Sequence, residues 1–278
     1  MKKLPILFGL LLFLGAFQAN AQSEPKRSIT QLGGDLYRFQ NNFHFSVFLV
    51  TEDGVLVTDP INADAATWLS NEIESRFGKP IKYLVYSHHH ADHISGGEVF
   101  KARGATVISH ENAVWGIESD SVVTAMPDIT FSDNMTLSLG GKSIQLKYLG
   151  RNHSDNSIVV LFPDEKILFA VDFINVNRLP YRNITRSFFP DYFDSYAQLA
   201  TLDFTLVAPG HGPTGSKQEA LDHGTYLKTL HDLVVEGKQA GKSAQELKTE
   251  ITLDAYKSWG RYDDWLPLNI EGMYQNVD

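Results

Sequence analysis

The chain has 278 residues, of which 43% are hydrophobic and 21% charged, a composition typical of a globular protein with one large domain. It has no cysteine, which excludes a disulfide framework, a thiolate nucleophile, an iron–sulfur cluster and any zinc site with a sulfur ligand. The formal net charge of −9 argues against binding to nucleic acid or to an anionic membrane as the main activity.

The first 21 residues are predicted to be a secretory signal peptide. Two lysines follow Met1, an apolar stretch covers residues 4–17, and Ala19 and Ala21 have the small-x-small spacing that precedes a cleavage site. The apolar stretch is short for a membrane span, so an uncleaved anchor is the less favoured alternative. We therefore expect a single domain over residues 22–278, without a stable membrane anchor, located in the periplasm or secreted.

The first half of this expected domain alternates short strands with helices. Alternating and buried apolar runs predict strands at residues 35–40, 46–50, 54–58, 81–86 and 105–109. Helical spacing of apolar residues predicts a helix over residues 64–77, and a shorter helix is expected over residues 95–102.

The second half also alternates predicted strands with helices. Strands are predicted at residues 135–139, 143–149, 157–162, 166–171 and 204–208. Helices are predicted at residues 195–202, 218–240 and 243–249, and an aromatic tail follows. Two strand-rich halves that each carry helices predict an α/β fold in which two sheets pack face to face with the helices outside.

Four of the 10 histidines lie within residues 88–93, directly after a predicted buried strand. His88 and His90 alternate in an extended segment and can project to the same side, and Asp92 and His93 follow them. Further candidates come directly after predicted strands or in the loops beyond them: His153, Asp172 and His211. Because imidazole and carboxylate are ligands of zinc, iron and manganese, this pattern predicts a metal site.

A solvated histidine loop without a metal is the alternative interpretation. The flanking residues favour the metal site, because Gly96 and Gly97 allow close approach of the backbone, and Gly210 and Gly212 bracket His211. His89 falls between two candidate ligands and is expected to point away from the metal. The remaining histidines have no motif around them and are expected at the surface or in the core: His44, His110, His223 and His231.

The order His88-x-His90-x-Asp92-His93, followed by His153, Asp172 and His211, resembles the metal-binding pattern of the metallo-β-lactamase superfamily of hydrolases. The resemblance covers residues 47–212. It implies a four-layer αβ/βα sandwich with two metals at one edge, between the two sheets. It also implies that Asp59, which follows a predicted strand, braces the histidine loop; a plain turn residue before Pro60 is the alternative.

The resemblance further implies how the ligands are divided. His88, His90 and His153 would hold one metal, Asp92, His93 and His211 would hold the other, and Asp172 would bridge them with a hydroxide. The implied cofactor is two Zn²⁺ ions, with iron or manganese as alternatives. Metals at about 3.5–4 Å from each other repel, and the bridging negative charge reduces this repulsion.

The implied chemistry is hydrolysis by a metal-activated hydroxide, because paired metals lower the pKa of bound water to near neutrality. Asp92 is the expected catalytic residue, which orients this hydroxide and accepts a proton. The absence of cysteine excludes the lactamases with a zinc-bound cysteine. Asp172 favours the glyoxalase II, lactonase and esterase branches, although a glyoxalase would need a basic cluster that the C-terminal helices do not show.

We therefore expect an exported, zinc-dependent hydrolase that attacks a carbonyl of a small-molecule substrate: a β-lactam, lactone, ester or thioester. The alternatives are a periplasmic metal-binding accessory protein without turnover and a phosphodiesterase of the same superfamily. Arginines and aromatic residues follow Asp172, where they suit an amphipathic substrate or pack the loop against the core: Arg178, Tyr181, Arg182, Arg186, Phe188, Phe189, Tyr192 and Phe193.

Overall fold

The computed structural model describes residues 24–184 and 187–277. The predicted signal peptide and Arg186 lie outside these residues. Within the described residues, no helix is long and apolar enough to cross a membrane.

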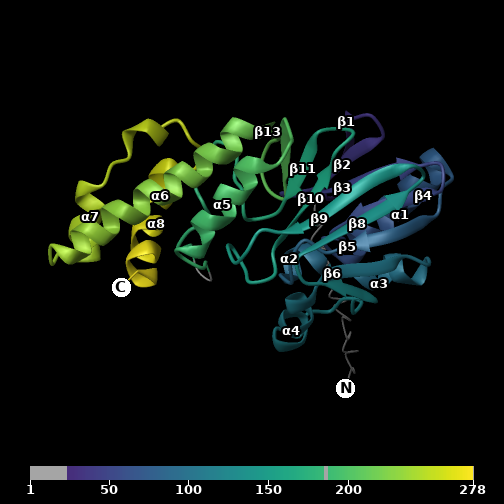
Figure 1. Ribbon diagram of the computed structural model, residues 1–278, viewed down its shortest axis with the longest axis horizontal. Helices are drawn as coiled ribbons and strands as arrows, with labels where there is room; N and C mark the ends of the chain where they lie inside the picture. Colours follow the sequence, from purple (N-terminus) through teal and green to yellow (C-terminus); the bar gives the residue numbers. More distant parts are fainter. Residues whose placement is uncertain (1–23, 185–186, 278) are drawn as a thin grey trace, which may run out of the picture.

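A seven-stranded sheet comes from the first half of the chain, with its strands in sequence order (Figure 1). The strands β1 to β4 pair antiparallel, and β4 to β7 pair parallel. Their bounds are β1 Arg27–Gly33, β2 Leu36–Asn41, β3 His44–Thr51, β4 Gly54–Thr58, β5 Ile81–Val85, β6 Thr106–His110 and β7 Ile129–Phe131. Because parallel strands need crossover connections, helices follow β4, β5 and β6: α1 Ala63–Phe77, α2 Ala91–Ile94, α3 Gly97–Ala102 and α4 Glu111–Ser119.

A six-stranded sheet comes from the second half, in the order β13-β12-β11-β10-β9-β8. Its strands are β8 Asn134–Leu139, β9 Lys142–Tyr148, β10 Ile158–Phe162, β11 Ile167–Ala170, β12 Leu206–Pro209 and β13 Gly215–Ser216. Only β11 and β12 pair parallel, and helix α5 Asp191–Thr201 lies between them in the chain. The remaining helices are α6 Lys217–Gln239, α7 Ala244–Glu250 and α8 Tyr262–Asn276, with a short 3₁₀ turn at Asp254–Tyr256.

Three apolar clusters show that these elements form four layers. The middle cluster joins the inner faces of the sheets, with Leu49 and Leu56 on one side and Leu146 and Phe169 on the other. A second cluster packs α1 and α3 against the outer face of the seven-stranded sheet, and a third packs α5 and α6 against the outer face of the six-stranded sheet. The predicted α/β sandwich of two sheets with helices outside is confirmed.

Local signals explain where the first long helix begins and ends. The Asn62 side chain accepts a hydrogen bond from the Ala65 backbone N–H at 2.8 Å, which caps the start of α1. Gly78 ends the helix in the left-handed region with φ of 59°. The strand predicted at residues 54–58 coincides with β4, and α1 starts one residue before its predicted start at 64.

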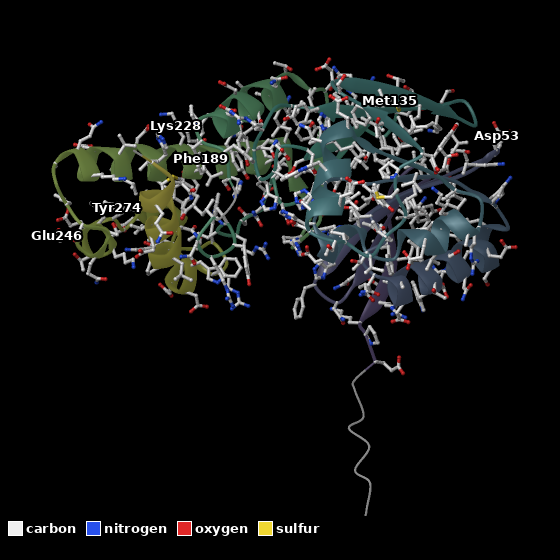
Figure 2. All side chains as sticks on the ribbon, turned by 90° about the horizontal axis from the view of Figure 1, so that it is seen from below. Asp53, Met135, Phe189, Lys228, Glu246 and Tyr274 are labelled. Carbon is white, nitrogen blue, oxygen red and sulfur yellow. The ribbon has the colours of Figure 1, made fainter. Side chains whose placement is uncertain are left out.

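Strand β1 and helix α8 are not predicted from the sequence. Strand β1 lies at the sheet edge and exposes polar residues, so it has no apolar alternation. Helix α8 contains Pro267, and because proline is unfavourable inside a helix, the sequence favours an irregular aromatic tail there. Figure 1 shows α6, α7 and α8 at one end of the molecule, and Figure 2 places Phe189, Lys228 and Tyr274 at that end, opposite Asp53 and Met135.

Candidate metal centre

Loops at one edge of both sheets carry all the predicted metal ligands. His88 and His90 follow β5, and Asp92 and His93 lie in α2, the short helix that begins next. The other candidates belong to the six-stranded sheet: His153 between β9 and β10, Asp172 after β11 and His211 after β12. Strand ends of this kind place side chains on loops that the sheets hold rigidly.

One group of donor atoms combines three histidines with Asp172. The ligand atoms of His88, His90, His153 and Asp172 all lie within 4.8 Å of one another. His153 Nε2 lies 3.1 Å from His90 Nδ1 and 3.4 Å from Asp172 Oδ2. His88 Nε2 lies 3.7 Å from the same Asp172 oxygen. This group corresponds to the predicted first metal together with its bridging carboxylate.

A second group shares Asp172 with the first and adds His93 and His211. His93 Nε2 lies 3.4 Å from Asp172 Oδ2, and His211 Nε2 lies 3.3 Å from Asp172 Oδ1. The two imidazoles approach each other at 3.2 Å between their Nε2 atoms. Asp92 Oδ2 stands at the rim of this group, 3.5 Å from His93 Nε2 and 3.9 Å from His211 Nε2.

These separations match the spacing of ligands around a small cation. Ligand atoms at about 2.0–2.1 Å from a tetrahedral zinc lie about 3.3 Å from one another. The Nε2 atom of His88 is buried and has no hydrogen-bond partner, and the same holds for Nε2 of His90. Buried polar atoms without partners are costly, and a cation at this site would satisfy His88 Nε2. The donor set therefore fits two transition-metal ions.

Hydrogen bonds behind His88 fix which of its nitrogens faces the site. Ser87 Oγ donates to Asp59 Oδ2 at 2.6 Å, so it accepts at 3.0 Å from Nδ1 of His88. That arrangement places the proton of the imidazole on Nδ1 and leaves the lone pair of Nε2 directed toward Asp172. Asp59 also accepts from the Ser87 backbone N–H at 2.8 Å and is fully buried. The structure thus places Asp59 as a brace of the histidine loop.

Burial keeps most of these imidazoles neutral. It lowers the pKa of His88 well below its ordinary value, and it lowers the pKa of His90 to about 3 and of His211 to about 4. Burial also lowers the pKa of His153. Since a histidine binds a metal through an unprotonated nitrogen, these residues are ready to act as ligands at neutral pH.

The carboxylates give the site an excess of negative charge. Burial alone would raise the pKa of Asp172, but the charge of His93 and the hydrogen bond from His93 hold it well below the ordinary value. For His93, burial lowers the pKa, yet Asp172, Asp92 and Asp59 raise it to about 9. The carboxylates thus attract positive charge to this point, and a divalent cation would replace the proton of His93.

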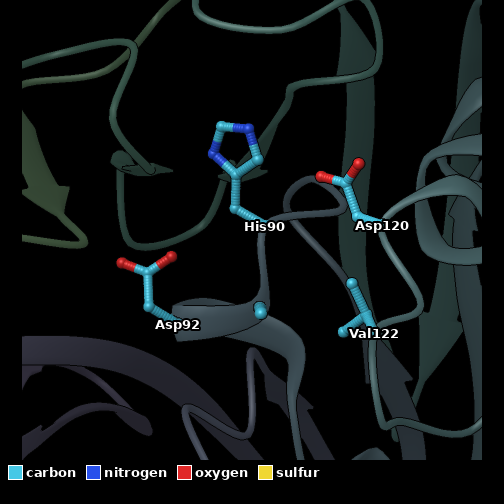
Figure 3. Close-up of a pocket in the computed structure, with 5 residues that line it drawn as sticks. His90, Asp92, Asp120 and Val122 are labelled. Carbon is cyan, nitrogen blue, oxygen red and sulfur yellow. The ribbon is translucent and has the colours of Figure 1, made fainter.

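An open pocket leads to this group of side chains. It has a volume of about 460 Å³ and is lined by His90, Ala91, Asp92, Asp120 and Val122. In Figure 3 the imidazole of His90 and the carboxylate of Asp92 rise from neighbouring positions, with Asp120 and Val122 across from them. Asp92 is half exposed, so a substrate or water molecule can reach its carboxylate.

Sequence comparisons agree with this geometry. A sequence model of the metallo-beta-lactamase superfamily matches residues 41–211. The chain is 31% identical over 177 residues to a metallo-beta-lactamase type 2 of Elizabethkingia meningoseptica, covering 60% of this chain and 70% of that protein. It is 27% identical over 243 residues to a metallo-beta-lactamase type 2 of Bacteroides fragilis, covering 80% and 94%.

The chain belongs to the metallo-beta-lactamase superfamily. A solved structure of a metallo-beta-lactamase from Pontibacter korlensis shares the fold, with a TM-score of 0.65 at 21% identity over 71% of this chain and 96% of that one. The resemblance found in the sequence is therefore confirmed. Members of the metallo-beta-lactamase superfamily are generally metal-dependent hydrolases, and the clustered histidines and aspartates suit such an activity.

One residue of this metallo-beta-lactamase superfamily member lies beside the candidate ligands although no motif in the sequence indicates it. His44 is partly exposed, and its Nε2 atom lies 3.3 Å from Asp92 Oδ2. His44 starts β3, and nothing in the local sequence connects it with residues 88–93. Its position depends on the packing of the β2–β3 hairpin beside β12, and no local sequence pattern indicates this packing.

Four histidines lie outside the candidate donor groups. His89 points away from them toward α4, where Gly116 leaves room for its ring and Asn156 contacts its Nδ1 atom. His110 accepts a hydrogen bond from the Asn112 backbone N–H at the start of α4. His223 is buried, and the ring of His231 meets that of Phe193 edge to face, with 5.2 Å between the centroids.

Most of the aromatic segment after Asp172 packs the fold. Tyr192 is buried, and Phe189 and Phe193 pack against the same cluster under α5 and α6. Phe188 instead lines a second pocket of about 380 Å³, together with His90 and Trp115. The packing interpretation therefore holds for Phe189, Tyr192 and Phe193, whereas Tyr181 is 62% exposed.

Proposed function

We propose that this protein is an exported, dinuclear zinc-dependent hydrolase of a small molecule: a β-lactam, lactone, ester or thioester. Hydroxide attacks the carbonyl carbon of the substrate, and the bond from that carbon to nitrogen, oxygen or sulfur breaks. The observation that carries the proposal is the pair of donor groups that share Asp172, one with His88, His90 and His153 and the other with His93 and His211. The signal peptide predicted over residues 1–21 supports export.

Two cations bound in these groups would lower the pKa of water and polarise the carbonyl oxygen of a substrate. Asp172 would hold both, because its two carboxylate oxygens reach the Nε2 atoms of His153 and His211 respectively. Asp92 would orient the attacking water and accept its proton. Its pKa, which burial alone would raise, is lowered by the hydrogen bond to His44 and by the charge of His93, so that the carboxylate stays ionised.

The walls of the site favour substrates that have an apolar part. Trp115 is 70% exposed and lines the second pocket with Phe188, next to His90. Val122 lines the first pocket beside Asp92. A ring or acyl chain would cover these side chains, while the polar carbonyl faces the histidines and carboxylates.

Hydrolysis of a substrate panel by the full chain, with zinc content measured on the same sample, tests the proposal. The panel contains a chromogenic β-lactam, acyl-lactones, aryl esters, a thioester and a phosphodiester. We expect turnover of at least one carbonyl substrate, loss of that turnover after removal of metal by a chelator, and recovery with Zn²⁺. Zinc binding without any turnover would instead support an accessory metal-binding protein, and turnover of the phosphodiester alone would support the phosphodiesterase alternative.

A matched substitution separates loss of the site from loss of the fold. His90→Ala removes a proposed ligand from a loop without changing the sheets. We expect this variant to have no turnover and to contain less zinc than the wild type. His231→Ala changes a histidine on α6, and we expect wild-type turnover. Equal activity of the wild type and His90→Ala would contradict the proposal.

A further inference from the structure

A third group of donor atoms lies on the open side of the metal centre. The ligand atoms of His44, Asp92 and His211 lie within 4.8 Å of one another. His44 Nε2 is 3.3 Å from Asp92 Oδ2, and the same oxygen is 3.9 Å from His211 Nε2. The rings of His44 and His211 meet edge to face, with 4.7 Å between their centroids. Two imidazoles and a carboxylate form a donor set that binds zinc, iron or manganese.

Backbone contacts hold His44 at this place. Phe45, the residue after His44, donates its backbone N–H to the carbonyl of Gly210 at 2.8 Å. The carbonyl of Phe43, the residue before it, accepts from Nδ1 of His211 at 2.9 Å. The two residues that flank His44 are thus tied to Gly210 and His211 themselves. These contacts hold the backbone of His44 beside His211.

Arg38 strengthens the same attachment. Its buried guanidinium donates to the carbonyls of Pro209 at 2.7 Å and Gly212 at 2.8 Å, one on each side of His211. Its guanidinium carbon lies 3.7 Å from the centroid of the Phe45 ring. The hairpin formed by β2 and β3 therefore carries Arg38, which holds the His211 loop, and His44, which faces His211.

The hydrogen bond to Phe43 also sets the tautomer of His211. Because Nδ1 carries the proton that the Phe43 carbonyl accepts, the lone pair is on Nε2, which faces the carboxylates of both Asp92 and Asp172. One lone pair binds one cation at a time. The group with His93 and Asp172 and the group with His44 and Asp92 therefore offer alternative positions on the two sides of a shared ligand.

We propose that His44, Asp92 and His211 form an outer position for the second cation, on the solvent side of the inner position held by His93, Asp172 and His211. The inference rests on the proposed function, since it concerns the same dinuclear centre. Exposure supports the order of the two positions: His93 is fully buried, whereas the His44 side chain is 28% exposed and Asp92 is 53% exposed. The outer position is where a cation exchanges with solvent.

The test uses a substitution that damages the inner position and also takes one ligand from the group of His88, His90 and His153, but spares the outer position. Asp172→Asn leaves His93 and His211 alone at the inner position but keeps the outer group complete. The chelator-treated full chain is equilibrated with Zn²⁺ by dialysis, and bound zinc is measured by atomic emission. We expect the Asp172→Asn protein to retain a second equivalent of zinc, and His44→Ala in that background to weaken its binding by about tenfold or more.

His44→Gln distinguishes a ligand from a hydrogen-bond partner, because glutamine can still donate a hydrogen bond to Asp92 but binds zinc poorly. We expect His44→Gln to behave like His44→Ala. His231→Ala is the matched control, since His231 also pairs with an aspartate, Asp232, at 3.1 Å, and it should leave zinc binding unchanged. Retention of the second equivalent when His44→Ala is added to Asp172→Asn, or when His44→Gln is added instead, would overturn the outer position.

A second measurement avoids the Asp172 variant in case it does not fold. Co²⁺ absorption spectra of the otherwise wild-type chain and of His44→Ala should differ in the bands that grow with the second equivalent, and identical spectra would overturn the inference. If the wild-type chain takes up no zinc, the proposed function itself is wrong. If the wild-type chain binds two zinc ions and substitution of His44 changes neither zinc binding nor the Co²⁺ spectrum, only the outer position is wrong.

Discussion

At the scale of single residues, the candidate metal centre contains imidazoles whose Nε2 atoms face Asp172 without a proton, as at His88 and His211. Ser87 and Asp59 position His88, and the carbonyl of Phe43 positions His211, so that each presents Nε2 to Asp172. Burial keeps these rings neutral by lowering their pKa values. The site therefore combines several unprotonated nitrogens with carboxylates, and bound cations would compensate both.

Asp92→Asn tests the role of the half-exposed carboxylate. The amide keeps the size of the side chain but cannot accept a proton, so we expect kcat to fall by about 10²–10⁴-fold while the circular dichroism spectrum stays unchanged. Asp53→Asn is the control, because Asp53 lies in the exposed turn between β3 and β4. A kcat for Asp92→Asn close to the wild-type value would assign the proton transfer to another group.

At the scale of elements, a buried hydrogen-bond chain connects helices to the segment that carries Asp172. Tyr192 and Tyr196 of α5 both donate to the carbonyl of Phe173 at 3.0 Å. His223 of α6 contacts the Tyr196 hydroxyl through Nδ1 at 2.5 Å and accepts from Asn175 through Nε2. Helices α5 and α6 therefore hold the backbone next to the bridging carboxylate.

His223 makes stability depend on pH. Burial lowers its pKa from 6.5 to about 3, so between these values the unfolded chain binds a proton that the folded chain does not. The stabilisation is complete above pH 6.5 and is lost as the pH falls, by up to about 1.4 kcal/mol per pH unit. Urea unfolding of metal-free wild type and His223→Gln at pH 7.5 and pH 5 measures this. We expect the variant to lose less stability over that interval; an equal loss would show that His223 does not contribute.

Gly272 tests the attachment of α8 to the rest of the molecule. A Cβ atom at this position would overlap the backbone carbonyl of Asn183, which lies against the helix. Gly272→Ala should therefore lower the free energy of unfolding by about 1–3 kcal/mol, as measured by urea titration. Gly260→Ala is the matched control, because its Cβ would meet Arg178 at an ordinary 3.4 Å. Similar losses in the two variants would contradict this explanation.

At the scale of the whole molecule, the metal centre joins the two halves of the sandwich. His88, His90, Asp92 and His93 come from the seven-stranded half, and His153, Asp172 and His211 come from the six-stranded half. Bound cations would therefore connect the sheets at one edge, in addition to the apolar cluster between their inner faces. Folding stability and metal affinity are coupled by this arrangement.

Removal of metal should lower the melting temperature. A ligand at 100 times its dissociation constant stabilises the folded state by about 2.7 kcal/mol, which corresponds to about 5–10 °C for a chain of this size. Calorimetry of chelator-treated protein with increasing Zn²⁺ should show this rise, and Mg²⁺ at the same concentrations should not. A melting temperature independent of zinc would mean that the site does not bind zinc in the folded state.

Local patterns in the sequence determined most helices, most strands and the identity of the candidate ligands. Apolar periodicity predicts α1 and β4 because burial on one face acts over a few residues, and the spacing of His88, His90, Asp92 and His93 is itself a local pattern. The superfamily followed from the order of these residues and is confirmed by the match to residues 41–211.

Only the tertiary structure decided which distant side chains meet. The position of His44 beside Asp92 depends on backbone hydrogen bonds between the β2–β3 hairpin and residues 209–212, far apart in the chain. The same holds for the brace at Asp59 and for the contact of Tyr196 with His223. Such contacts form when the sheets and helices pack, and packing has no periodic signature in the sequence of either partner.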